Sequence, residues 1–249
     1  MSEVAAGERP VVLLVGGSPE PASVETVRRA AAGCVAVVAI DRGLERVLEA
    51  GLVCDLFCGD GDSVGIRGAA AVEAAERVAA GRLNAPGEDG CFEVVRYNPH
   101  KDDTDLGLAL GEVARRWPGA VVRATCLGGG SPDHLLGVLG RLASYRPDAA
   151  QADAHGADAA TPAVEIVEDA YAGRILHAGE CWRIEGLVGS RFSFIPLSPS
   201  SVVSEAGMRW ELDHHRVPLL DDLGISNVIE RAQARITCHE GTLACWLFS

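Results

Sequence analysis

The stretch VVLLVGGSPEPASVETVRRAAAGCVAVVAIDRG, residues 11–43, decides the fold. Residues 11–15 and 35–40 are short apolar runs rich in β-branched side chains, which predict two buried strands. Residues 20–32, between them, predict a helix. A strand, a helix and a second strand in this order form the repeating unit of a mostly parallel sheet that helices cover on both faces.

The same alternation continues to residue 145. Further helices are expected at 44–50, 69–80, 104–117 and 132–145, and further strands at 52–58, 92–97 and 121–127. Residues 81–90 are polar, contain glycine and predict a surface insertion. We therefore expect a mostly parallel α/β domain over residues 1–146.

The character of the chain changes after this domain. Residues 147–162 are dominated by Ala, Asp and Pro and predict a linker. Residues 163–249 are expected to form an all-β domain, a β-sandwich or flattened barrel, so that the fold class is α/β plus all-β. Its strands are expected at 164–167, 171–177, 181–185, 191–195, 202–204, 208–212, 233–238 and 242–248. The residues His239-Glu240-Gly241 predict a hairpin between the last two.

Composition excludes several classes of function. The 249 residues include 22 Lys and Arg against 35 Asp and Glu, which gives a formal net charge of −13. A surface this acidic repels phosphate backbones, so we expect no nucleic-acid partner. No apolar run approaches the ~20 residues of a membrane span, and residues 1–10 lack the apolar core of a signal peptide. The eight cysteines form no CxxC pair, which is typical of a reduced, cytoplasmic protein.

Carboxylates follow most of the predicted parallel strands. Ligands bind outside the carboxyl ends of the strands in an open α/β sheet, and four successive loops bring acids to that edge. These acids are Asp41, Asp60 with Asp62, Asp102 with Asp105, and Asp133. A single Asp before a helix is usually an N-cap, but four such loops together favour a site for a hard cation, which prefers oxygen ligands. The pattern predicts magnesium-dependent handling of a polyphosphate.

Two further features of these loops suit phosphate groups. Gly128, Gly129 and Gly130 let backbone amides approach a ligand closely, and a predicted helix begins directly after them. Lys101, beside Asp102, offers a point charge for a phosphate.

The order of these motifs resembles that of the thiamine pyrophosphokinases. The residues that carry the resemblance are DRG at 41–43, GDGDS at 59–63, KDDTD at 101–105 and GGGSPDH at 128–134, followed by FIPL at 194–197, GMRWEL at 207–212 and GISN at 224–227. The resemblance extends from Val11 to the end of the chain. It implies that the diphosphoryl group of ATP passes to the hydroxyl group of thiamine, leaving AMP. It also implies a homodimer whose active site lies at the subunit interface.

The resemblance also assigns roles to individual residues. Asp60 and Asp62, with Asp102 or Asp105, would hold Mg²⁺ on the phosphates of the co-substrate ATP, and Asp133 and His134 would lie near the acceptor. Trp210 would stack on thiamine, as a cationic heterocycle is attracted to an indole face. Ser226 and Asn227 would line the thiamine pocket. Further binding candidates from the motifs are Asp41, Ser63, Lys101, Thr104, Gly129 and Gly130.

The chain departs from the family pattern at several positions. Ser131 stands where the family often has Arg, which removes a bidentate phosphate contact, and Arg42 could restore that charge from another loop. Val138 and Val228 replace an Asn and a Glu of the family pattern. Two alternatives therefore stay open: a diphosphokinase for another hydroxymethyl heterocycle, such as a pterin, and a non-catalytic binder of thiamine or its diphosphate.

Overall fold

The computed structural model describes residues 9–80, 92–97, 103–147 and 162–248. The chain forms two compact units: the first comprises Met1–Val138 and Val167–Asp169, the second Leu139–Ile166 and Ala170–Ser249. The predicted division into 1–146, 147–162 and 163–249 stays a prediction, and most of the predicted linker and the predicted insertion at 81–90 lie outside the described residues.

The first unit is built on five parallel strands in the order β5-β1-β2-β3-β4. Their bounds are β1 Val11–Val15, β2 Ala36–Ile40, β3 Leu56–Gly59, β4 Glu93–Arg96 and β5 Val121–Thr125. In register, Val12 of β1 lies between Ala36 of β2 and Val122 of β5. All five residues of β2 are buried, which explains why this strand reads as a continuous apolar run.

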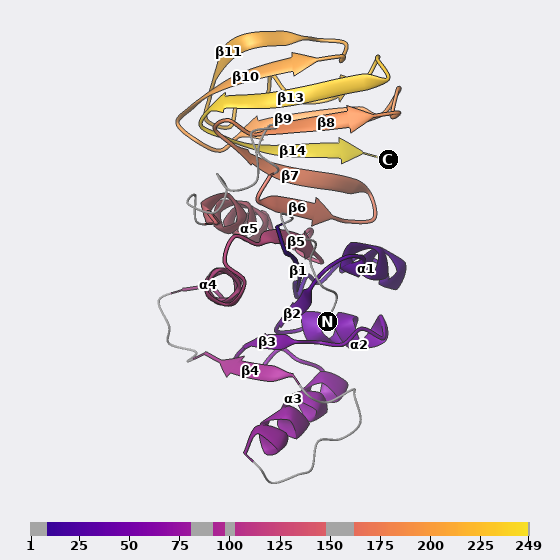
Figure 1. Cartoon of the computed structure of the whole chain (residues 1–249), viewed down its shortest axis with the longest axis vertical. Helices are drawn as coiled ribbons and strands as arrows, with labels where there is room; N and C mark the ends of the chain where they lie inside the picture. Colours follow the sequence, from indigo (N-terminus) through magenta and orange to yellow (C-terminus); the bar gives the residue numbers. More distant parts are fainter. Residues whose placement is uncertain (1–8, 81–91, 98–102, 148–161, 249) are drawn as a thin grey trace. The chain divides into compact units, whose positions relative to one another are not determined.

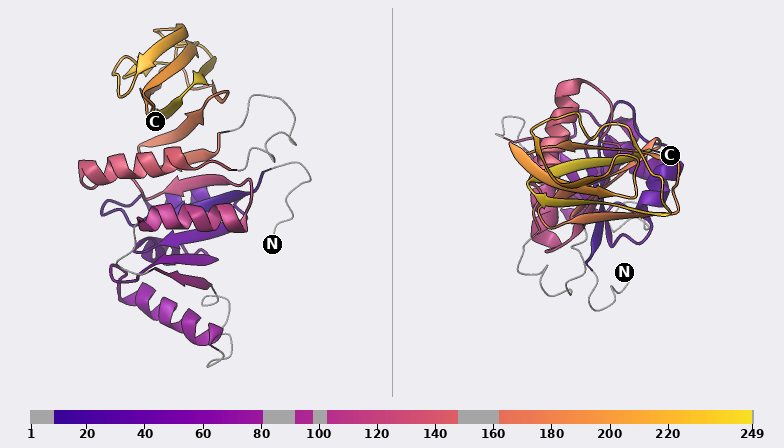
Figure 2. Two further views of the ribbon diagram at one scale, coloured as in Figure 1. Left: turned by 90° about the vertical axis from the view of Figure 1, so that its left-hand side faces the viewer. Right: turned by 90° about the horizontal axis from the view of Figure 1, so that it is seen from above.

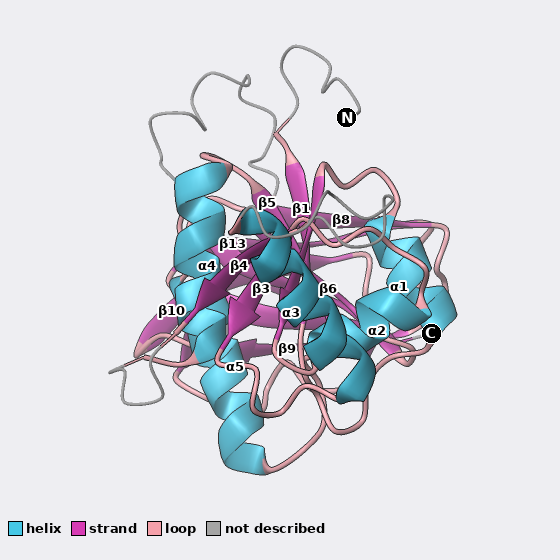
Figure 3. Ribbon diagram, turned by 90° about the horizontal axis from the view of Figure 1, so that it is seen from below, coloured by secondary structure: helices cyan, strands magenta, loops and turns pink. Residues whose placement is uncertain are grey.

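Helices cover both faces of this sheet, as predicted. The helices α1 Val24–Ala31, α2 Gly43–Glu49 and α3 Ile66–Ala79 share one apolar core with the sheet. The helix α4 Asp105–Arg116 packs on β2 and β3 from the opposite side, where Figures 1 and 3 show it apart from α1 and α2. Figure 2 (left) shows α4 in front of the strands. The last helix, α5, spans Pro132–Ser144.

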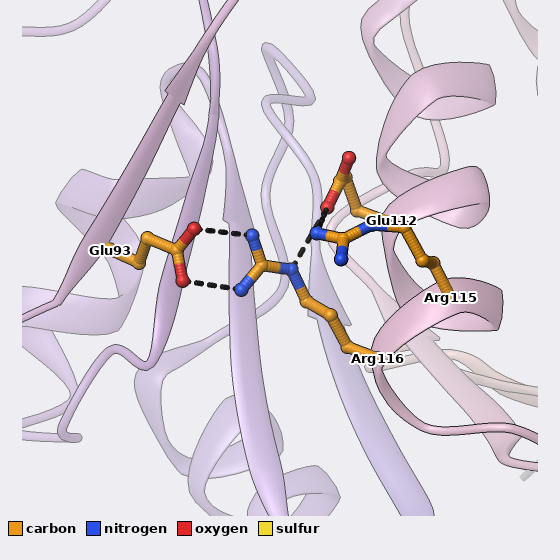
Figure 4. A network of polar contacts seen from close by, with 4 residues as sticks. All are labelled: Glu93, Glu112, Arg115 and Arg116. Atoms are coloured by element: carbon orange, nitrogen blue, oxygen red, sulfur yellow. Dashed lines mark hydrogen bonds and ion pairs between the residues drawn. The ribbon is translucent and has the colours of Figure 1, made fainter.

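A network of ion pairs fastens the edge strand β4 to α4. The guanidinium of Arg116 binds Glu93 of β4 with both terminal nitrogens, and its Nε donates to Glu112 at 2.9 Å (Figure 4). Arg115 donates to the same Glu112 carboxylate at 2.6 Å. The planar guanidinium of Arg116 thus contacts one carboxylate from β4 and one from α4. These two contacts fix the position of the strand relative to the helix.

The second unit is a β-sandwich. Five of its strands lie side by side in the order β12-β9-β14-β7-β6, and the other four form a sheet in the order β11-β10-β13-β8. The bounds are β6 Val164–Val167, β7 Tyr171–His177, β8 Cys181–Glu185, β9 Arg191–Pro196, β10 Ser200–Ala206, β11 Leu212–Pro218, β12 Asn227–Val228, β13 Gln233–Glu240 and β14 Thr242–Phe248. Side chains from both sheets, among them Phe194 and Ile236, share one core. The predicted fold class, α/β plus all-β, is confirmed.

Two local predictions in this unit are wrong. The residues around Gly241 do not form a hairpin, because β13 pairs with β8 and β10 whereas β14 pairs with β7 and β9. Gly241 has φ +86° and turns the chain from one sheet to the other. A strand is also predicted at 208–212, but β11 begins only at Leu212. The residues before it follow a turn at Gly207, which has φ +77° and comes directly after the end of β10.

No helix within the described residues is long and apolar enough to cross a lipid bilayer.

Candidate functional site

The strand order of the first unit creates a switch point between β1 and β5. The chain leaves β1 toward β2, β3 and β4 on one side and later returns to add β5 on the other. The loops after β1 and β5 therefore diverge, and ligands of open α/β sheets bind in the crevice that such divergence leaves. A cavity of about 430 Å³ lies at this position. Its lining consists of Gly17, Ser18, Pro19, Ile40, Asp41, Arg42, Ser63, Leu127, Gly128, Gly129, Gly130, Ser131, His134 and Val138.

The glycine loop after β5 is held by two side chains. Glu168 accepts hydrogen bonds from the backbone N–H groups of Leu127, at 3.1 Å, and Gly128, at 3.3 Å. The hydroxyl of Ser18 donates to the carbonyl oxygen of Gly128. Glu168 is buried, and burial raises the pKa of its carboxyl group. The motifs did not indicate Glu168, because it lies far along the chain from the loop that it orders.

Gly129 and Gly130 continue this loop with φ of +78° and +75°. These left-handed conformations suit glycine, and both residues are exposed at the cavity. The loop leads directly into the first turn of α5. Backbone N–H groups at a helix N-terminus form a favourable environment for anions. The predicted role of this loop in binding an anion is thus consistent with its local geometry.

Asp41 lies where β2 ends. Its backbone N–H donates to Cys58 of β3 at 3.1 Å, and its φ is +45°. The carboxylate of Asp41 packs against Gly59, where a Cβ atom would overlap Asp41 Oδ1. The close approach of β3 to Asp41 thus requires glycine at position 59 and fixes the acid at the rim of the cavity.

Asp60 and Asp62 lie in one tight turn after β3. The Asp62 N–H donates to Asp60 Oδ1 at 3.0 Å. The pKa of the Asp62 carboxyl is raised, mainly by its hydrogen bond with Asp60 and next by the negative charge of Asp60. The negative charge of Asp105 makes a smaller contribution in the same direction. Arg96 of β4 holds this turn in place, since its Nη1 donates to the Asp60 carbonyl oxygen at 2.7 Å. Arg96 is a second residue that the motifs did not indicate.

Thr104 and Asp105 begin α4. The Thr104 hydroxyl accepts from the Gly107 N–H at 3.2 Å, which makes Thr104 the N-cap of the helix. Asp105 is the first residue of α4, and its charge reaches Asp62. The other two candidates of this motif, Lys101 and Asp102, lie outside the described residues.

The carboxylates of this region fit a magnesium–nucleotide site only in part within the described residues. Along 9–80, 92–97, 103–147 and 162–248, no group of three or more His, Cys, Asp or Glu could hold a metal ion. The paired acids Asp60 and Asp62 supply two carboxylates in one turn. Mg²⁺ is commonly bound by one or two carboxylates together with substrate phosphates and water, so this pair suits the ion that the sequence predicts.

Asp133 and His134 occupy the exposed first turn of α5, and His134 also lines the cavity. The Ser131 side chain lowers the pKa of Asp133 by hydrogen bonding to it. Arg42 lines the same cavity as Ser131, and its guanidinium forms no ion pair with any described residue. A guanidinium therefore lies at the lining of the cavity where Ser131 takes the place of an expected Arg.

The three candidates of the second unit form a separate group. Trp210 is 57% exposed, whereas Asn227 is only 3% exposed. The Asn227 amide holds the Trp210 backbone on both sides: its Oδ1 accepts from the Trp210 N–H at 3.2 Å, and its Nδ2 donates to the Trp210 carbonyl at 2.8 Å. Ser226 is exposed with φ +63°, and its N–H donates to Ser193 Oγ at 2.9 Å. Of these three candidates, Trp210 and Ser226 are therefore the exposed ones.

The candidates thus gather within each unit. One cavity of the first unit is lined by the candidates Asp41, Ser63, Gly129, Gly130 and His134. A hydrogen bond joins Asp60 to Asp62, and the charge of Asp105 acts on Asp62. In the second unit, the contacts of Asn227 connect it to Trp210.

Comparisons with known proteins agree with this architecture. Residues 183–243 match the family model described as thiamin pyrophosphokinase, vitamin B1 binding domain. The crystal structure of thiamine pyrophosphokinase from Bacillus subtilis superposes with a TM-score of 0.71 at 20% identity, over 96% of this chain and 99% of that one. The thiamin pyrophosphokinase from Candida albicans gives a TM-score of 0.68 at 12% identity, over 96% and 89%. No curated protein sequence matches the chain.

Proposed function

We propose that this chain, whose fold and matched vitamin B1 binding domain support membership of the thiamine pyrophosphokinase family, transfers the diphosphoryl group of ATP to the hydroxyl group of thiamine. The observation that carries the proposal is the cavity at the switch point of the first unit, which combines a glycine loop, a helix N-terminus and an arginine without an ion pair among the described residues. Together these groups suit a polyphosphate.

In the proposed reaction the hydroxyl oxygen of thiamine bonds to the β-phosphorus of ATP. The bond from that phosphorus to the oxygen bridging to the α-phosphorus breaks, and AMP leaves with this oxygen. The hydroxyl proton passes to solvent or to a nearby base. The products are AMP and thiamine diphosphate. Such transfers depend mainly on positioning and on neutralisation of charge, by analogy with phosphoryl transfer.

In this proposal, different residues of the first unit bind the phosphate groups and the magnesium ion. The amides of Gly129 and Gly130 and the N-terminus of α5 would bind phosphate oxygens, and Arg42 would supply the positive charge that Ser131 lacks. Asp60 and Asp62, with Asp105 or Asp102, would hold Mg²⁺. When bound, the ion would withdraw charge from the phosphates and favour departure of AMP. The turn that carries Asp60 and Asp62 is already fixed by Arg96.

The second unit would supply the acceptor side. Trp210 would offer its exposed indole, over which the Arg209 guanidinium lies 5.6 Å from the ring centroid, to a flat cationic ring, and Ser226 would offer a hydroxyl group on the neighbouring turn. The matched region 183–243 contains both residues. We further propose a homodimer in which the first unit of one subunit acts with the second unit of the other.

A product assay tests the reaction. The protein is incubated with ATP, Mg²⁺ and thiamine, and nucleotides and thiamine species are separated by chromatography. We expect AMP and thiamine diphosphate in equal amounts, and loss of both when Mg²⁺ is chelated or when Asp60 is changed to Asn. The matched control is Asp213→Asn, since Asp213 is an exposed acid of the second unit with the same charge.

Other products would redirect the proposal. ADP with thiamine monophosphate would reject the reaction type. AMP release with a pterin alcohol but not with thiamine would identify another acceptor, and binding of thiamine without turnover would identify a sensor.

Mixed dimers test the shared active site. Asp60→Asn and Trp210→Ala chains are each assayed alone at low thiamine and then after mixing and subunit exchange. If each active site uses Asp60 of one subunit and Trp210 of the other, half of the sites in a mixed dimer are intact, and activity recovers to about a quarter of the wild-type value. No recovery despite demonstrated exchange would place both residues of a site in the same subunit.

A further inference from the structure

The sandwich of the second unit contains a buried acid, Glu205. Glu205 lies on β10 and is 2% exposed, and its register partners on the neighbouring strands are Leu212 and Ile236. Its Oε2 accepts a hydrogen bond from the Asn227 amide at 3.2 Å, and its Oε1 is buried without a partner among the described residues. A buried carboxylate without a cation is costly, so a specific reason is needed for an acid in this position.

The group that Glu205 contacts is the one that holds Trp210. The Asn227 Nδ2 atom donates both to Glu205 and to the Trp210 carbonyl oxygen, while Asn227 Oδ1 accepts from the N–H groups of Trp210 and Val228. Glu205 therefore fixes the orientation of an amide that contacts both sides of the Trp210 residue. Around it, Arg209 N–H donates to the Val228 carbonyl at 2.9 Å, which keeps the same two segments together.

The surroundings of Glu205 favour its neutral form. No Arg, Lys or His among the described residues forms an ion pair with it, and the titratable group within electrostatic reach is the thiol of Cys245 on β14, whose pKa burial raises. Burial raises the pKa of Glu205 to about 7, against the smaller opposite effect of the Asn227 hydrogen bond. The acid is thus protonated below neutral pH and ionised above it.

We infer that Glu205 is a positioning residue for Trp210, which acts through Asn227: its carboxyl group accepts the hydrogen bond that orients this amide, and ionisation of the acid strengthens that bond. The effect on thiamine binding rests on the proposed function, because it requires Trp210 to contact the substrate. The link from Glu205 to Trp210 itself does not.

Nuclear magnetic resonance tests this link without substrate. The indole N–H signal of Trp210, assigned from its loss in Trp210→Phe, is followed from about pH 5.5 to about pH 8.5. We expect a shift with a midpoint near pH 7 in the wild type and no such shift in Glu205→Gln, which has the same shape and stays neutral. Glu180→Gln is the matched control, since Glu180 is another buried acid of the second unit and contacts the His177 backbone instead.

Steady-state kinetics then test the consequence for the substrate. In Glu205→Leu, which is expected to fold because Leu suits an apolar interior, we expect the KM for thiamine to rise about tenfold with kcat unchanged, the equivalent of one lost hydrogen bond. Glu205→Gln should keep the wild-type KM below pH 7. An unchanged Trp210 signal in Glu205→Leu, or the wild-type titration in Glu205→Gln, would overturn the inference. A titrating Trp210 signal without turnover of thiamine would instead count against the proposed function alone.

Discussion

The carboxylate of Asp41 lies in the space that a side chain at Gly59 would fill. Asp41 directly follows β2, and Gly59 is the last residue of the adjacent parallel strand β3; the Asp41 N–H donates to the carbonyl oxygen of Cys58, the residue before Gly59, at 3.1 Å. The acid and the glycine are therefore one structural unit at the rim of the cavity, although 18 positions separate them in the sequence.

The first prediction concerns this pair. In Gly59→Ala the new methyl group must displace the Asp41 carboxylate, and we expect a loss of about 1–3 kcal/mol in the free energy of unfolding together with a raised KM for ATP. Denaturant unfolding and steady-state kinetics measure the two effects. Gly111→Ala is the control: Gly111 lies in α4 with open space around it, so Ala there should stabilise the helix by up to about 1 kcal/mol. Equal behaviour of the two variants would contradict the packing argument.

The second prediction concerns the support of the acidic turn. Arg96 donates to the Asp60 carbonyl oxygen and forms an ion pair with Glu76 of α3. In Arg96→Ala we expect the turn to lose its fixed position, so that the Mg²⁺ concentration for half-maximal rate rises about tenfold, as for one lost charge-assisted hydrogen bond.

Arg77→Ala provides the matched control for this variant. It removes the same charge from another exposed ion pair, with Glu73, and should leave the Mg²⁺ requirement unchanged. A similar change in both variants would assign the effect to net charge rather than to the position of the turn.

The third prediction concerns the exposed indole. If Trp210 stacks on the cationic ring of thiamine, Trp210→Ala should raise the KM for thiamine by about tenfold or more, and Trp210→Phe by less, because a cation–π contact contributes about 1–2 kcal/mol and Phe is the weaker ring. Initial rates over a range of thiamine concentrations give both values. Trp117→Phe, at the end of α4 in the other unit, should change neither. An unchanged KM in Trp210→Ala would exclude the stacking role.

The fourth prediction follows from the raised pKa of Glu205. In the unfolded chain this carboxyl titrates near its ordinary 4.5, and in the folded chain near 7. Between these values the unfolded state releases a proton that the folded state keeps, so the stability of the wild type falls with rising pH relative to Glu205→Gln, by up to about 1.4 kcal/mol per pH unit. Below pH 4.5 and above pH 7 the difference should be constant. Urea unfolding of both proteins across this range measures it, and a constant difference throughout would show that Glu205 is ionised in the folded protein.

The carboxyl ends of the strands could be predicted from the sequence because parallel topology alone brings them together. Asp41 and the glycines at 128–130 follow from the loops after their strands, whereas Ser63 follows from the family resemblance; Asp41, Ser63, Gly129 and Gly130 line one cavity. Periodicity is enough to place the loops at one edge, since it requires only the order of strands and helices, but it assigns no role to a residue such as Ser63.

The supporting residues could not be predicted in the same way. Glu168 orders a loop 40 positions earlier, and Arg96 holds a turn 36 positions earlier. Neither lies in a motif, and the atoms that they bind in the loop and the turn are backbone atoms, which every residue type carries. Glu205 resembles an ordinary strand residue until its burial is known. The wrong prediction of a hairpin at Gly241 has a related cause. A glycine turn between two strands is compatible both with strands that pair in one sheet and with strands that belong to two different sheets.

The contact of Glu168 with the glycine loop has a consequence for modularity. The first unit is not a continuous piece of sequence, since it includes Val167–Asp169 as well as Met1–Val138. A fragment that stops at residue 146 would encode every strand of the parallel sheet and still leave the Leu127 and Gly128 amides without their acceptor. The first unit is therefore incomplete without residues 167–169. A chimaera with a relative must take residues 167–169 from the same parent as the glycine loop.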